Sequence, residues 1–176
     1  LLMDSAEIDL LTIARGTVMA PAGCGKTQLI ARALAAHRGS KPILVLTHTN
    51  AGVAALRGRL DRAGVPRSAY RLSTIDGWAI RLIANFPGRS GHDPDILRLA
   101  TPARDYPAIR DAAWKLLQAG HVNAVLNASY ARLIVDEYQD CSVPQHYLVY
   151  HLSLILPTCV LGDPMQGIFG FGGNAL

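Results

Sequence analysis

The sequence has no apolar run long enough to cross a bilayer, and residues 1–7 lack the basic and apolar segments of a signal peptide. We therefore expect a cytoplasmic protein without membrane contacts. Its three cysteines, Cys24, Cys141 and Cys159, do not have the spacing of metal ligands, which predicts reduced thiols. Internal repeats and low-complexity segments are also missing. Half of the 176 residues are hydrophobic, which excludes a disordered chain and predicts a single domain over residues 1–176.

Short β-rich segments alternate along the chain with segments of helical periodicity. We predict strands at residues 16–19, 42–47, 71–73, 131–135 and 158–161, and helices at residues 28–36, 49–62, 75–85, 106–119, 121–129 and 143–155. Residues 86–102 are rich in Gly, Pro and Asp and predict a loop. Residues 42–47 form a continuous apolar run, which is typical of a strand covered on both faces. The alternation predicts an α/β fold with a mainly parallel sheet and helices on both faces.

Residues 20–27, with the sequence APAGCGKT, have the pattern of a phosphate-binding loop in which a small residue replaces the first glycine. A predicted strand precedes the loop and a predicted helix follows it. Such a loop directs backbone N–H groups and the positive end of the helix dipole at an anion. Lys26 is expected to reach the β- and γ-phosphates, and Thr27 to ligate Mg²⁺. The expected nucleotide-binding residues are Ala22, Gly23, Cys24, Gly25, Lys26, Thr27 and Gln28.

The predicted strand at residues 131–135 runs directly into two carboxylates, Asp136 and Glu137. In parallel α/β sheets, ligands bind at the carboxyl ends of the strands. We expect Asp136 to hold Mg²⁺ through its water shell and Glu137 to accept a proton from the attacking water. The alternative is that an acid here only caps the next helix. The adjacent pair favours hydrolysis of a nucleotide.

Three further features leave alternatives open. Gln166 follows the last predicted strand, where it either contacts the γ-phosphate and the attacking water or is a polar turn residue. Phe169 and Phe171 either anchor a loop in the core or stack on unpaired bases. Six arginines lie close together between residues 57 and 81, and the net charge of the chain is +4. These arginines form either a solvated helix face or a surface for nucleic-acid phosphates.

Five motifs, in order, resemble those of the first RecA-like domain of superfamily 1A DNA helicases, the UvrD/Rep-like group. They are APAGCGKT at residues 20–27, THTN at residues 47–50, STIDGW at residues 73–78, VDEYQD at residues 135–140 and GDPMQGIFGFGG at residues 162–173. The resemblance covers nearly the whole chain. It implies a RecA-like P-loop NTPase fold with a short, mostly helical insertion at about residues 86–130.

The resemblance implies an ATP-dependent helicase or translocase that acts on single-stranded DNA. Lys26, Glu137 and Gln166 match its catalytic residues, and Thr27 and Asp136 match the residues that hold Mg²⁺ beside ATP. The positions that match its strand-binding face are Thr47, His48, Asn50, Trp78, Phe169 and Phe171. Motifs of the family's second RecA-like domain, including its arginine finger, have no match in this sequence. We therefore expect that domain as a partner, and weak nucleotide binding and poor hydrolysis by this chain alone.

The chain also departs from the family pattern at several positions. His48 stands where the family usually has Phe, Asp76 replaces a His, and Gly172 replaces an Arg. Asp76 would repel a phosphate that it faced. Asp76 and Gly172 motivate an alternative function, a nucleotide-sensing regulatory domain that controls a partner protein such as a nuclease. A small-molecule kinase is a third hypothesis, which the Asp-Glu pair and the basic helix after Thr49 argue against.

Overall fold

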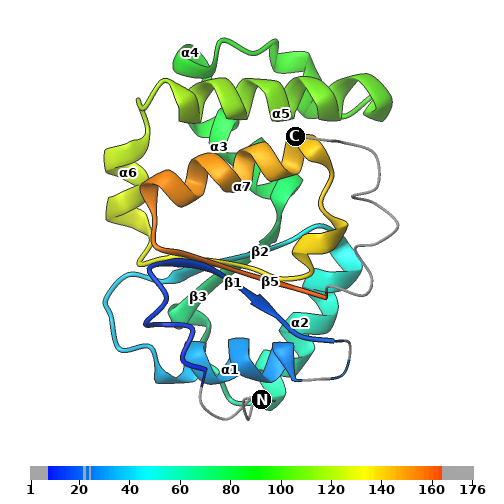
Figure 1. The fold of residues 1–176 in the computed structure, drawn as a ribbon. Helices are drawn as coiled ribbons and strands as arrows, with labels where there is room; N and C mark the ends of the chain where they lie inside the picture. Colours follow the sequence, from blue (N-terminus) through cyan, green and yellow to red (C-terminus); the bar gives the residue numbers. More distant parts are fainter. Residues whose placement is uncertain (1–7, 22, 24, 164–176) are drawn as a thin grey trace, which may run out of the picture.

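The computed structural model describes residues 8–21, 23 and 25–163 (Figure 1). Five parallel strands form one sheet in the order β1-β5-β4-β2-β3. They are β1 (Arg15–Met19), β2 (Ile43–Thr47), β3 (Tyr70–Thr74), β4 (Leu133–Val135) and β5 (Thr158–Gly162). The predicted α/β fold with a parallel sheet is confirmed. All five strands therefore end at the same edge of the sheet.

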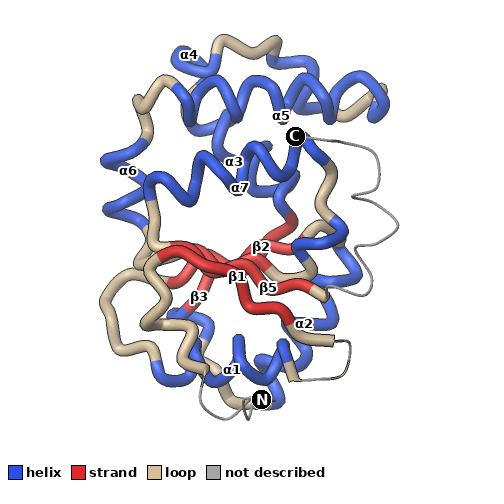
Figure 2. Tube along the Cα trace, viewed as in Figure 1, coloured by secondary structure: helices blue, strands red, loops and turns tan. Residues whose placement is uncertain are grey.

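Helices cover both faces of the sheet (Figures 1 and 2). One face carries α1 (Lys26–Ala36) and α2 (Asn50–Arg62), and the other carries α3 (Ile75–Asn85), α6 (Asn123–Ser129) and α7 (Val143–Ile155). Outside α3 and α7 lies α5 (Pro102–Gln118), next to the short α4 (Pro87–Ser90). The remaining helical turns are η1 (Arg67–Ala69), η2 (Pro94–Arg98) and η3 (Tyr138–Asp140). Among the described residues, no helix combines the length and the hydrophobicity needed to cross a membrane.

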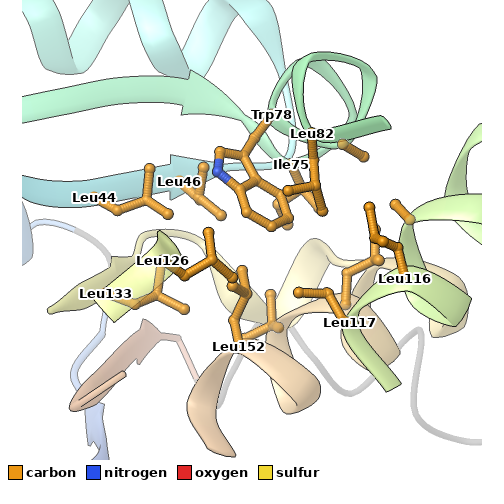
Figure 3. Packing of buried hydrophobic residues seen from close by; sticks show 14 of the residues in the cluster. Leu44, Leu46, Ile75, Trp78, Leu82, Leu116, Leu117, Leu126, Leu133 and Leu152 are labelled. Carbon is orange, nitrogen blue, oxygen red and sulfur yellow. The ribbon is translucent and has the colours of Figure 1, made fainter. Parts of the chain in front are cut away.

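Alternate residues of the central strands enter two separate cores, because successive side chains of a strand point to opposite faces. Leu44 and Leu46 of β2 pack with residues of α3, α5 and α7 (Figure 3). Ile43 and Val45 of the same strand pack with residues of α1 and α2. All five residues of β2 are buried. This two-sided burial is the physical reason for the unbroken apolar run in the sequence.

The largest difference from the predicted elements lies at residues 86–106. The helix predicted to begin at residue 106 begins at Pro102, and the predicted loop contains α4 and η2. Pro102 is the first residue of α5, a position where a missing N–H costs nothing. The backbone N–H of Thr101 donates to the Asp105 carboxylate at 2.8 Å, which fixes the start of the helix. A local side-chain contact of this kind sets a boundary that composition does not reveal.

Candidate nucleotide-binding site

The loop between β1 and α1 depends on two glycines with left-handed backbones. Gly23 has φ 80° and Gly25 has φ 79°, a conformation that L residues with a side chain rarely adopt. Gly25 is the N-cap of α1, and within the described part of the chain no side-chain cap hydrogen bond forms at the start of this helix. The N–H groups of its first turn and the positive end of the helix dipole are therefore available to an anion. Ala22 and Cys24, predicted from the same motif, lie outside the described residues.

The Lys26 ammonium folds back over the loop that it follows. Its Nζ donates to the carbonyl oxygens of Ala20 at 2.5 Å and Pro21 at 3.2 Å. Ala20 itself is tied to the sheet, since its N–H donates to the Gly162 carbonyl at 3.0 Å. The ammonium therefore lies beside the loop and is held by neutral carbonyl oxygens. A phosphate oxygen can replace them, because a negatively charged acceptor attracts the cation more strongly than a neutral carbonyl does.

The two predicted acids follow β4 at the carboxyl edge of the sheet. Asp136 is buried, and its N–H donates to the Leu46 carbonyl of the neighbouring strand at 2.8 Å. Glu137 has φ 53°, a left-handed backbone that is uncommon for a residue other than glycine. Its N–H donates to the Asp136 Oδ1 at 3.0 Å, and its side chain is 45% exposed. The pair therefore divides into an enclosed carboxylate and an accessible one.

Burial raises the pKa of Asp136, and the neighbouring Glu137 charge raises it further. The hydrogen bond from the Glu137 N–H and the positive charges of Lys26 and Arg59 act in the opposite direction. Asp136 consequently lies within electrostatic reach of both cations. A divalent cation at this carboxylate would offset the cost of keeping it charged in a buried position.

Residues of the loop, both acids and two arginines line one cavity of about 770 Å³. Residues that line it include Gly23, Gly25, Lys26, Thr27, Gln28, Arg59, Arg62, Asp136, Glu137 and Gln139. The predicted nucleotide-binding residues that the structure describes therefore share one site with both predicted acids. Thr27 and Asp136 supply oxygen donors of the kind that Mg²⁺ prefers, so the side chains present fit that ion.

Five lining residues were not among the predicted nucleotide-site residues: Ala31, Arg59, Arg62, Ala63 and Gln139. Two of them, Arg59 and Gln139, make hydrogen bonds that shape the site. Arg59 of α2 donates from Nη1 to the Thr27 Oγ1 at 2.5 Å. The Gln139 Oε1 accepts from the Asp163 N–H at 3.0 Å and so links the ends of β4 and β5. Arg59 was part of the arginine cluster, for which a solvated helix face and a nucleic-acid surface were the two interpretations. Only the packing of α2 beside α1 reveals that this arginine reaches the loop.

The positions that resemble a strand-binding face fall into different environments. Thr47 is buried, His48 is partly buried, and Asn50 is exposed at the first turn of α2. Trp78 is only 3% exposed and packs in the core beside Leu46, Ile75 and other apolar residues (Figure 3). The prediction that Trp78 contacts a DNA strand is therefore not supported, because a ring enclosed by core side chains cannot stack on a base. Gln166, Phe169 and Phe171 lie outside the described residues.

Asp76, which the sequence suggested would repel a facing phosphate, is used inside the protein. Its two carboxylate oxygens accept from the Arg110 Nε and Nη2, both at 2.7 Å. The Gln145 Nε2 donates to the same carboxylate at 3.2 Å. Asp76, Arg110 and Gln145 belong to α3, α5 and α7, so one carboxylate joins three helices. We call these residues the three-helix network.

A family model described as an AAA domain, AAA_19, matches residues 8–172 of the chain. This P-loop domain type is found in UvrD/Rep-like helicases. No curated protein matches the chain. The match supports nucleoside triphosphatase chemistry for a cavity that joins a glycine loop, a lysine and two carboxylates.

Proposed function

The chain belongs to the AAA_19 family of P-loop domains, and on that premise we propose that it is the ATP-binding and ATP-hydrolysing core of a UvrD-like DNA helicase or translocase. The observation that carries this proposal is the shared cavity. It places the uncapped first turn of α1, Lys26 and both acids around one space. Five motifs in the order of that helicase group support the assignment.

In the proposed site, the residues divide the work of phosphoryl transfer to water. The loop N–H groups and Lys26 bind and orient the phosphates. Thr27 and Asp136 would hold Mg²⁺, and the ion would supply positive charge beside the phosphate oxygens. Glu137 accepts a proton from the attacking water, and its partial exposure leaves it accessible to that water. Arg59 contacts the Thr27 hydroxyl and adds a positive charge to the same space.

The proposal includes a nucleic-acid surface and a partner domain. We propose that single-stranded DNA contacts His48 and Asn50, together with Phe169 and Phe171. Trp78 has no part in that surface. We also propose a second RecA-like domain as the partner that supplies an arginine to the γ-phosphate, a contribution that can amount to ~10³–10⁵ in rate.

Calorimetry with Mg-ATP tests the proposed nucleotide site. Lys26→Ala should lower the affinity about 10- to 100-fold, since a hydrogen bond to a charged group contributes ~1.5–3 kcal/mol. Lys41→Ala is the matched control, because the Lys41 Nζ donates to the Asn127 carbonyl away from the loop. Glu137→Gln should keep ATP binding and lose hydrolysis in a single-turnover assay. Equal affinities for the Lys26 variant and the wild type would overturn the assignment.

Stimulation by single-stranded DNA separates a helicase core from a nucleotide-sensing regulatory domain. The helicase proposal predicts that an oligonucleotide binds the chain and raises its residual ATPase rate. ATP binding that no oligonucleotide changes would contradict the helicase proposal and support the regulatory alternative.

A further inference from the structure

A cluster of three potential metal ligands lies where β2 and β4 end. His48 directly follows β2, Glu137 follows Asp136 at the end of β4, and Asp140 is the last residue of η3. One ligand atom from each of the three side chains lies within 4.8 Å of the others. The sheet brings the three residues together, since β2 and β4 are neighbouring strands. We call His48, Glu137 and Asp140 the His-Glu-Asp cluster.

The His48 ring nitrogen in this cluster lacks a hydrogen bond. Nδ1 is buried and has no hydrogen-bond partner among the described residues. Its distance to the Glu137 Oε2 is 3.8 Å, which is too long for a hydrogen bond. Leaving a buried polar atom without a partner costs about 1–3 kcal/mol. A separation of 3.8 Å is close to that of two ligand atoms on one metal ion, each ~2.0–2.2 Å from the ion.

The second carboxylate of the cluster is already oriented by a neighbour. The Gln139 Nε2 donates to the Asp140 Oδ2 at 2.9 Å. Outer contacts of this kind hold the ligands of protein metal sites in position. Asp140 is exposed and Glu137 is half exposed, so both side chains can adjust. Bound Zn²⁺ needs donor atoms ~2.0–2.2 Å from the ion, and small movements of these two carboxylates would supply them.

We propose that the His-Glu-Asp cluster is a binding site for a divalent transition-metal ion of the Zn²⁺ class. One imidazole and two carboxylates match the donor set of such ions, whereas Mg²⁺ prefers oxygen ligands alone. Three protein ligands leave at least one coordination position for water. The site is separate from Thr27 and Asp136, which are proposed to hold Mg²⁺.

Occupancy of this site has a consequence that rests on the proposed function. A Glu137 carboxylate that coordinates a metal ion cannot accept a proton from the attacking water. Zn²⁺ at micromolar or higher concentrations would therefore inhibit ATP hydrolysis reversibly and leave the phosphate loop free to bind nucleotide. His48 makes this control specific to the chain, because the helicases that it resembles usually have Phe at this position.

Metal binding to the nucleotide-free chain tests the site independently of hydrolysis. Titration with Zn²⁺ in a calorimeter should give one site, and His48→Phe should lower its affinity at least tenfold. His121→Phe is the matched control, because His121 is exposed near the start of α6 and outside the cluster. Asp140→Asn should also weaken binding, and thermal melts verify that each variant is folded. Unchanged Zn²⁺ affinity in folded His48→Phe would overturn the proposal.

Cobalt absorption distinguishes this cluster from a cysteine site. Co²⁺ bound by nitrogen and oxygen should give visible ligand-field bands without a thiolate charge-transfer band. A thiolate band that persists in His48→Phe would overturn the proposal. In ATPase assays without DNA, each protein is compared with its own zinc-free rate. Zn²⁺ should lower the wild-type rate, with recovery on adding a chelator, and should not lower the rate of His48→Phe. Binding without inhibition would overturn the regulatory consequence, whereas absent Mg-ATP binding by the zinc-free protein would overturn the proposed function and leave the metal site standing.

Discussion

Removing the cation of the three-helix network should destabilise the domain strongly, although the change lies away from the nucleotide cavity. In Arg110→Met, the Asp76 carboxylate loses two charge-assisted hydrogen bonds of 2.7 Å and, among the residues that the structure describes, keeps the Gln145 amide at 3.2 Å as its one side-chain partner. The Arg110 and Asp76 side chains are 21% and 16% exposed. Little water is therefore available to replace the lost partner.

The expected loss follows from this degree of burial. Breaking a fully buried ion pair by removing one partner costs about 3–5 kcal/mol, whereas exposed pairs contribute about 0–1 kcal/mol. For a pair that keeps roughly a fifth of its surface in water, we expect the free energy of unfolding to fall by ~2–3 kcal/mol. At ~2–4 °C per kcal/mol for a domain of this size, the melting temperature falls by about 4–12 °C. Asp76→Asn should cost a similar amount.

The assay is urea unfolding followed by circular dichroism, with a double-mutant cycle of Asp76→Asn and Arg110→Met. We expect a coupling energy of about 2 kcal/mol, because the two residues act as one pair. Lys115→Met is the control on the same helix, since the 2.7 Å Lys115–Asp111 pair is 63% and 50% exposed and should cost at most ~0.5 kcal/mol. Arg110→Met that costs no more than Lys115→Met would refute the reasoning.

Three other predictions concern the core and the cavity. Trp78→Ala should cost ~3–5 kcal/mol in urea unfolding, because it leaves a large void in the core, and a change in DNA affinity without a loss of stability would contradict this role. Asp136→Asn should stabilise the nucleotide-free protein in thermal melts near neutral pH. The raised pKa of Asp136 means that the folded protein loses stability when this carboxyl group loses its proton. The difference in melting temperature between variant and wild type should therefore grow as the pH rises above ~4, the pKa of an unfolded aspartate. Arg59→Ala should weaken Mg-ATP binding about tenfold in calorimetry, since it removes a cation beside Thr27, while Arg57→Ala on the exposed side of α2 should not.

Local patterns in the sequence predict the sheet and the phosphate loop well, for identifiable reasons. β2 is an unbroken apolar run because both of its faces are covered, and Gly23 and Gly25 are needed for backbone conformations that other residues resist. Parallel strands end at one sheet edge, so the placement of Asp136 and Glu137 opposite the loop follows from topology. These features depend on neighbours in sequence or on the fold class alone.

Features that depend on packing between distant segments could not be predicted in this way. Arg59 and Thr27 are 32 residues apart in the sequence, and they meet only because α2 lies beside α1. The resemblance matched Trp78 to a strand-binding position, but this side chain of α3 packs in the core beside Leu46 of β2 (Figure 3). The local sequence suggested that Asp76 would repel a phosphate. Its partner Arg110 lies 34 residues further on, so the local sequence does not reveal the ion pair. Each case needs the tertiary arrangement of helices that composition and periodicity do not supply.

The left-handed backbone of Glu137 creates a conflict between thermal stability and activity at this one position. Glycine or asparagine would adopt φ 53° at lower cost, by about 1 kcal/mol, yet neither can serve as the proposed proton acceptor. A library of variants at position 137 that is screened only for thermal stability should therefore be enriched in glycine or asparagine. The same library screened for ATP hydrolysis should be enriched in glutamate. The residue recovered at this position therefore shows whether stability or catalysis was selected.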